Sequence, residues 1–446
     1  MAGEWIETTL GEVTDFLSGG TPSKDRPDYW GGSIPWVSAK DMKRFRLEDT
    51  EDHVSEDGVA NGTRLVPAGS VLVLARGMTL LNDLPICVIS RPMTFNQDVK
   101  ALRPKPHILR EYLPYLLLGN KDRLLSLVDL AGHGTGRLNS DELKALDVAL
   151  PSQSEQRAIA RILGALDDKI ELNRRMNETL EAIARALFKS WFVDFEPVRA
   201  KATGRDSGLP QPVTDLFPDS FEDSDLGEIP KGWNAGPLER VLSELEVGSR
   251  PKGGVSSYSE GVPSIGAESI VGLGRFDYSK TKFIPRSFFD SMKKGHVKNR
   301  DVLLYKDGGR PGEYEPHVTL VGDGFPFATC AINEHVYRLR AKSTLGQNYL
   351  VFWLSSDLVM EEMRIKGTGV AIPGLNSTQV KSLRTLIPSP GVIGAFDDIS
   401  DRLIASVLST CNESRTLATL RDVLLPRLVS GALRVNDARK FIERVA

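Results

Sequence analysis

The chain has 446 residues, of which 41% are hydrophobic, and a formal net charge of −3 at pH 7. This length exceeds what a single hydrophobic core serves, so the sequence predicts two to four domains. There is no run of about twenty apolar residues, and the start, MAGEWIETTLGE, is acidic where a signal peptide is basic and then apolar. We therefore expect a cytoplasmic protein with no membrane partner.

The first predicted domain spans residues 1–151 and is rich in glycine and turns. Two short apolar runs within it, 71–74 and 85–89, are typical of buried strands. Cys87 lies far from Cys330 and Cys411, and no CxxC or CxxxH spacing occurs. The cysteines therefore predict neither a disulfide framework nor a metal site.

A long helix is predicted over residues 152–196. Ser152 and Glu155 form a capping-box pattern at its start. Apolar residues then recur in steps of three and four, a heptad pattern interrupted by two asparagines, which predicts a coiled-coil seam. The seam consists of Ile159, Leu163, Leu166, Ile170, Asn173, Asn177, Leu180 and Leu187.

Residues 197–230 are predicted to be an acidic, proline-rich linker. Positions 201–230 hold seven acidic residues against Lys201 and Arg205, a net charge of −5 that leaves +2 for the rest of the chain. We interpret these acids as solvating a linker without a fixed scaffold, and not as metal ligands.

The second half of the chain repeats the first. Residues 138–152, LNSDELKALDVALPS, match residues 375–389, LNSTQVKSLRTLIPS, without a gap at an offset of 237, which drifts to about 228 further upstream. Apolar runs at 302–304 and 318–321 again predict buried strands. The sequence therefore predicts a tandem duplication, with a second α+β domain over residues 231–388.

A second long helix and a C-terminal tail are predicted over residues 389–446. Its seam is poorer: Phe396, Leu403, Val407, Leu417 and Leu424 are the apolar members. The start, Pro388-Ser389-Pro390, has no capping box, so we expect this helix to begin later or to fray, and Pro426 predicts a kink near its end.

Each predicted helix, at about 60 Å, is too long to cover one face of a domain of about 150 residues. We therefore expect the two seams to pack together, and duplicated halves related by a pseudo-two-fold axis make the pair antiparallel. The predicted fold is α+β: two tandem pseudo-symmetric domains joined by two long antiparallel coiled-coil helices.

Two globular domains held at a fixed distance by a pair of helices match a long, rigid ligand with pseudo-two-fold symmetry, and duplex DNA is such a ligand. The parts that lead into the helices agree closely between the halves, whereas residues 20–90 and 250–330 share little. This pattern favours one scaffold that carries two different reading surfaces for two unrelated half-sites around an uninspected spacer. The alternative is a non-catalytic coiled-coil scaffold that binds only proteins.

Several motifs, in a specific order and spacing, resemble those of type I restriction-modification DNA specificity subunits over nearly the whole chain. They are the two LNS segments that run into [LI]-P-S, QRAIA at 156–160, LDDKI at 166–170, NETLE at 177–181, FKSWFVDFEP at 188–197, LGEIPKGW at 226–233 and LRDVLLPRL at 420–428.

This resemblance implies two target-recognition domains that read a bipartite DNA site with a degenerate spacer. It further implies partners: double-stranded DNA, two adenine methyltransferase (modification) subunits and, in the full complex, two restriction motor subunits.

The chain is predicted to be non-catalytic and to need no cofactor. An amino-methyltransferase that flips a base would need an Asn/Asp-Pro-Pro-aromatic loop, and ATP binding would need a GxxxxGK[ST] loop. Neither string occurs in the sequence.

Candidate DNA-contacting residues are basic side chains beside glycines, because glycine removes bulk and frees backbone amides for close approach to phosphates and base edges. They are Lys24, Arg76, Arg137, Lys252, Lys306, Arg310 and Lys366.

Overall fold

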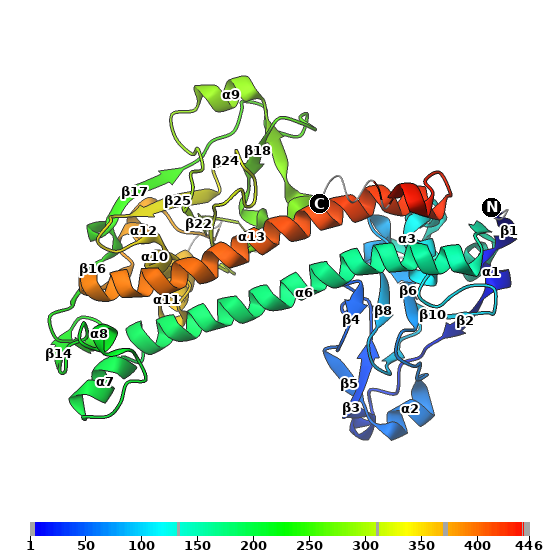
Figure 1. The fold of residues 1–446 in the computed structure, drawn as a ribbon, viewed down its shortest axis with the longest axis horizontal. Helices are drawn as coiled ribbons and strands as arrows, with labels where there is room; N and C mark the ends of the chain where they lie inside the picture. The colour runs from blue at the N-terminus through cyan, green and yellow to red at the C-terminus, as the bar shows by residue number, and fades with distance from the viewer. Residues whose placement is uncertain (1–4, 132–133, 309–311, 369–372, 439, 441–446) are drawn as a thin grey trace. The chain divides into compact units, whose positions relative to one another are not determined.

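The computed structural model describes residues 5–131, 134–308, 312–368, 373–438 and 440. They form two compact units (Figure 1): unit 1 comprises Met1–Lys169 and Leu417–Ala446, and unit 2 comprises Ile170–Thr416. The first long helix begins in unit 1 and ends in unit 2, and the second does the reverse.

The strands described in unit 1 form four sheets. Their strand orders are β2-β10-β6-β8-β4, β5-β3-β9, β1-β13 and β11-β12-β7. The strands are β1 Ile6–Thr9, β2 Thr14–Ser18, β3 Trp30–Val37, β4 Arg46–Leu47, β5 Asp52–Val54, β6 Val71–Leu74, β7 Arg76–Gly77, β8 Ile86–Ile89, β9 Thr94–Phe95, β10 Val99–Pro104, β11 Val128–Ala131, β12 Thr135–Leu138 and β13 Asp147–Leu150.

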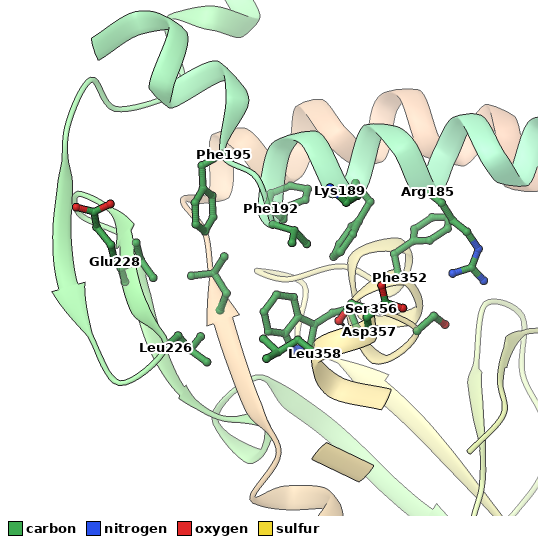
Figure 2. A pocket seen from close by; sticks show the side chains of 16 residues that line it. Arg185, Lys189, Phe192, Phe195, Leu226, Glu228, Phe352, Ser356, Asp357 and Leu358 are labelled. Carbon is green, nitrogen blue, oxygen red and sulfur yellow. Dashed lines mark hydrogen bonds between the residues drawn. The ribbon is translucent and has the colours of Figure 1, made fainter. Parts of the chain in front are cut away.

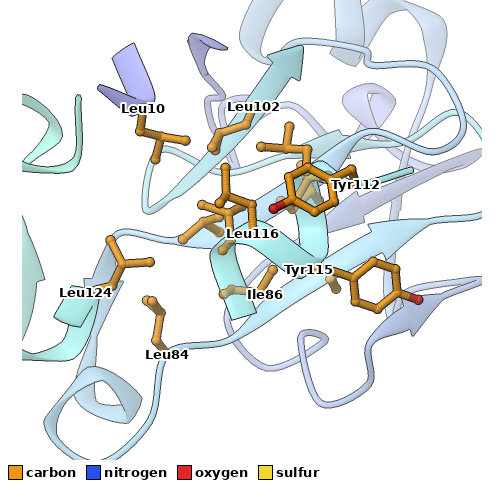
Figure 3. Close-up of a cluster of buried hydrophobic side chains, with 14 of the residues drawn as sticks. Leu10, Leu84, Ile86, Leu102, Tyr112, Tyr115, Leu116 and Leu124 are labelled. Atoms are coloured by element: carbon orange, nitrogen blue, oxygen red, sulfur yellow. The ribbon is translucent and has the colours of Figure 1, made fainter. Parts of the chain in front are cut away.

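Short helices complete unit 1: α1 Leu10–Val13, α2 Glu56–Gly62, α3 Leu113–Gly119, α4 Lys121–Ser126 and α5 Ser140–Ala145. The core forms where α3 packs against the largest sheet, and Figure 3 shows Tyr112 and Leu116 beside Ile86 and Leu102. Strand β6 is buried along its whole length, which explains its unbroken apolar run VLVL.

Unit 2 repeats three of these sheets in the same order. The sheet β17-β25-β22-β23 corresponds to β2-β10-β6-β8, β21-β18-β24 to β5-β3-β9, and β16-β26 to β1-β13. The strands are β16 Asn234–Pro237, β17 Leu242–Val247, β18 Val262–Ile265, β19 Ile270–Gly272, β20 Arg275–Phe276, β21 Lys282–Ile284, β22 Val302–Tyr305, β23 Val318–Leu320, β24 Ala331–Ile332, β25 Val336–Ala341 and β26 Arg384–Ile387. The four strands expected from apolar runs are thereby confirmed.

The repeated LNS segment has a local structural reason. Asn139 accepts a hydrogen bond from the Asp141 amide at 3.0 Å and caps α5. Asn376 accepts from the Gln379 amide at 2.9 Å and caps α12, Ser377–Lys381. Each asparagine satisfies a free amide at a helix start. Unit 2 also contains the helices α9 Arg286–Ser291, α10 Gln347–Leu354 and α11 Asp357–Gly367.

The two long helices are α6, Gln153–Phe192, and α13, Pro390–Val429, each of 40 residues. Both boundaries of α13 lie 237 positions after those of α6, so the expectation of a later or frayed start was wrong. Proline at the first helical position sacrifices no intrahelical hydrogen bond and has the required φ already fixed, so Pro390 can start the helix without a capping box. Pro426 lies inside α13, which continues to Val429.

The predicted seam residues of both helices are all buried or half-buried. Within unit 2 their polar members meet: the wholly buried Asn173 donates from Nδ2 to Glu413 Oε2 at 2.8 Å and to Ser414 Oγ at 3.2 Å. One turn further on, Asn177 accepts from the Thr410 hydroxyl and donates to Cys411 Sγ at 3.2 Å. Residues later in α6 contact residues earlier in α13, so the two helices are antiparallel.

A second polar contact between the helices lies in unit 1. Asp167, which is 6% exposed, accepts from Arg421 Nη1 at 2.7 Å and from the Tyr115 hydroxyl at 2.9 Å. Near the start of α6, the Glu155 amide donates to Ser152 Oγ at 3.4 Å while its carboxylate lies 3.3 Å from Arg434. The Asp167 contact ties α6, α13 and α3 of this unit together.

Residues 197–230 are folded, which corrects the prediction of a linker without a scaffold. They form α7 Glu196–Ala202, α8 Gln211–Thr214 and the hairpin β14 Phe221–Ser224 with β15 Gly227–Pro230. Val198, Phe217 and Ile229 are buried in the core of unit 2. Their hydrophobic burial holds the segment, while the acidic side chains of the hairpin stay at its surface.

We predict that Asp167→Ala destabilises unit 1 by about 2 kcal/mol, because it removes the acceptor of the Tyr115 hydroxyl and one of the two carboxylate partners of Arg421. The measurement is hydrogen exchange of the amides in 160–169 and 417–425. The matched control is Asp168→Ala, since Asp168 pairs with Arg46 at the surface, where ion pairs contribute about 0–1 kcal/mol. Equal protection in the two variants would contradict the assignment.

Candidate nucleic-acid interface

The structure brings two of the candidate residues together. Arg76 on β7 and Arg137 on β12 are paired directly across the strands, next to the pair Gly77 and Gly136. Both arginines are exposed, and no ion pair of either is seen in the part of the chain that the structure describes. Like charges directly opposite one another destabilise a sheet, so this arrangement favours an anion as the missing partner.

The glycines beside these arginines have a packing reason. A Cβ added at Gly136 would lie 2.7 Å from the Leu80 Cβ, which is too close for any side chain. Gly136 therefore lets β12 lie directly on the turn that contains Leu80, and this close packing fixes the strand that carries Arg137. The guanidinium groups are thus held on paired strands and not on a free loop.

Lys24 and Lys252 occupy corresponding loops, Lys24 between β2 and β3 and Lys252 between β17 and β18. Both side chains are exposed, and no carboxylate partner is found for either among the described residues. Each unit therefore has one exposed candidate lysine in this loop.

Lys306, in contrast to Lys24 and Lys252, has a carboxylate partner. Its ammonium pairs with Asp307, which also accepts from His335 Nδ1. Burial raises the pKa of the Asp307 carboxyl, but the bonds from Lys306 and His335 outweigh it and hold this pKa below its usual value. The carboxylate is therefore charged and offsets the charge of Lys306. Arg310 lies outside the described residues.

Lys366 is also engaged: it pairs with Glu362 at 2.8 Å and donates to Ser382 Oγ at 3.0 Å. The fold nevertheless brings its segment to that of Lys306. The Gly374 amide donates to the Gly367 carbonyl at 2.9 Å, and Gly374 forms a β-bridge with Asp307.

Sequence reasoning missed Asp307 and His335 as members of this cluster. A signal was present, because the repeat aligns His335 with Asp98 inside the matching segments 96–99 and 333–336. An acidic residue in one half and a histidine at the equivalent position of the other show that the two halves differ at this position.

Two further properties bear on the function. Within the described residues, no group of three His, Cys, Asp or Glu side chains is arranged to hold a metal ion. No helix in that same part of the chain is long and apolar enough to cross a bilayer.

The chain is similar to known proteins over nearly its whole length. Residues 2–182 match the family model of the type I restriction modification DNA specificity domain. The chain is 27% identical to the type I restriction enzyme MjaIX specificity subunit of Methanocaldococcus jannaschii, covering 97% of this chain and 94% of the relative. It is 24% identical to the HindI specificity subunit of Haemophilus influenzae, covering 96% of this chain and 100% of the relative.

Among solved structures, the S subunit of a type I restriction-modification system from M. genitalium has a similar fold, with a TM-score of 0.53 at 14% identity. The match covers 95% of this chain and 96% of that one. Residues 2–182 are thus similar to a type I restriction modification DNA specificity domain, and over nearly its whole length the chain is similar to specificity subunits of type I restriction enzymes.

Proposed function

We propose that this chain is a non-catalytic subunit that recognises a bipartite DNA site, two short half-sites around a degenerate spacer. In this proposal each unit reads one half-site of duplex DNA. The chain also assembles two adenine methyltransferase subunits and, for restriction, two motor-nuclease subunits.

One observation carries the proposal of two unlike half-sites: equivalent positions in the repeated scaffold hold different chemistry. Arg137 of unit 1 is matched at the offset of 237 by Gly374 of unit 2. Each is paired across strands, Arg137 with Arg76 and Gly374 with Asp307. Where unit 1 presents two arginines, unit 2 presents a charge-balanced cluster of Lys306, Asp307 and His335. Side chains that differ in this way select different base edges.

Arginine is suited to the task in unit 1. Its planar guanidinium forms paired hydrogen bonds with the O6 and N7 of guanine, and it also binds phosphate in bidentate fashion. Because both arginines are exposed and lack a carboxylate partner among the described residues, binding DNA would not first require an internal ion pair to break.

The surface of α6 supports the proposal of protein partners. Leu172, Met176 and Ile183 are exposed, and their spacing of four and seven places them on one face of the helix. An apolar face of this kind on a helix that already packs against α13 is typical of a protein–protein interface. A methyltransferase subunit is the partner that we assign to it.

We predict that Arg76→Ala with Arg137→Ala weakens binding to the cognate duplex by about tenfold or more, because two cation contacts with DNA are lost. The slope of log K against log salt should fall by about one for each phosphate contact that is removed. Fluorescence anisotropy over a salt series measures both. The control is Arg103→Ala, which removes the same charge from an arginine of this unit that is paired with Asp15 at 2.8 Å. An unchanged affinity in the double variant would remove these residues from the interface.

Base-resolved maps of adenine methylation test the bipartite site. Deleting the gene should abolish methylation at one motif made of two short half-sites and a fixed spacer. In cells that carry the Arg76→Ala and Arg137→Ala chain, methylation should become tolerant of changes in one half-site only, since the second unit is intact. Relaxation of both half-sites, or an identical map in the deletion strain, would reject the assignment of one half-site to each unit.

A further inference from the structure

An apolar cavity of unit 2 contains none of the candidate DNA-contacting residues. It has a volume of about 290 Å³ and lies between the end of α6, the hairpin β14–β15 and the junction of α10 and α11 (Figure 2). Aromatic rings form its wall, among them Phe188, Phe192 and Trp353, while Val193 and Leu358 on its edge are exposed. The cavity is therefore apolar inside and accessible from the surface.

One wall residue is held in a strained backbone conformation. Phe195, at the start of α7, has φ of 54° and ψ of 34°, in the left-handed region that favours glycine. Its ring lines the cavity, and the centroid of this ring lies 6.0 Å from the centroid of the Trp233 ring. A bulky residue keeps this conformation only where the surrounding structure enforces it, so the cavity wall is a fixed surface.

The charges at the rim are unbalanced toward acid. Arg185 pairs with Glu181 at 2.8 Å, and Lys189 pairs with Asp194. Glu228 and Asp357 also line the cavity and are exposed, and no ion pair of either exists among the residues that the structure describes. An apolar cavity with two unpaired carboxylates at its edge suits an apolar side chain that is followed by a basic one.

The cavity is duplicated with the chain. Unit 1 contains a cavity of about 260 Å³, and seven of its ten lining residues lie 237 positions from residues that line the cavity of unit 2. Leu116 corresponds to Trp353, Asn120 to Asp357, and Val429 to Phe192. A site retained at the same place in both halves fits a partner that is present in two copies. The unit 1 copy lacks the aromatic wall, and its lining includes the charged residues Glu7, Asp147 and Arg123.

We propose that the two cavities are unequal docking points for the methyltransferase subunits, each taking one large apolar side chain and a neighbouring basic residue of that partner. This inference rests on the proposed function. The unit 2 cavity binds its methyltransferase subunit more tightly, because its wall of aromatic rings buries more apolar surface of the anchoring side chain. At about 290 Å³, it is at the small end of ligand pockets and suits a single anchoring side chain.

The test uses the full chain and its cognate methyltransferase subunit. Native mass spectrometry and calorimetry should find two copies bound in two steps that differ at least tenfold in affinity. Val193→Arg places a cation at the rim of the acidic cavity and should weaken the tighter step by about tenfold or more, so that one methyltransferase subunit remains bound at low micromolar concentration. Glu228→Gln with Asp357→Asn should weaken the same step several-fold and reduce its salt dependence.

Two matched variants complete the design. Ser430→Arg makes the equivalent change in unit 1, since Ser430 lies 237 positions after Val193, and it should affect the weaker step alone. Val271→Arg alters an exposed apolar residue of unit 2 that does not line the cavity and should affect neither step; thermal melting checks that all variants fold. Two equal steps in the wild type, or wild-type binding by Val193→Arg, would overturn this inference. A wild-type chain that binds DNA but no methyltransferase subunit would overturn the proposed assembly itself.

Discussion

The amide nitrogen of a buried asparagine needs hydrogen-bond acceptors, and in this protein that requirement constrains the register of the two long helices where they pack in unit 2. Asn173 is wholly buried in the helix seam and donates to Glu413 and Ser414. Sliding α13 by one turn would break these hydrogen bonds, at a cost of about 1–3 kcal/mol for each polar group that is left unsatisfied. These hydrogen bonds therefore fix which residues of α6 and α13 face each other within unit 2.

The elements governed by periodicity and by local capping could be predicted from the sequence. The heptad steps located α6, and the repeat at an offset of 237 transferred its boundaries to α13, although the absent capping box suggested otherwise. The LNS segments coincide with helix caps at Asn139 and Asn376. The asparagines that interrupt one predicted seam face Thr410 and Ser414 of the other, so the polar positions that weakened each seam alone are complementary in the pair.

Features that depend on contacts distant in sequence could not be predicted. Lys306 looked available because it precedes a glycine loop, but Asp307 balances its charge and His335, 28 residues later, completes the cluster. Acidic composition suggested that 197–230 was solvated, whereas a few widely spaced apolar residues, Val198, Phe217 and Ile229, decide its fold. Arg76 and Arg137 are 61 positions apart in the sequence, and only the strand register shows that they are neighbours.

The sulfur of Cys411 lies in the helix seam, where it accepts from Asn177 and donates to the Gly274 carbonyl at 2.9 Å. Burial raises the pKa of this thiol to about 12, so it stays protonated at neutral pH. Since thiolates are the reactive form, alkylation of Cys411 requires the helices to separate or the loop of Gly274 to lift. The rate at which a thiol reagent alkylates Cys411 would therefore report how often α6 and α13 separate, including during assembly.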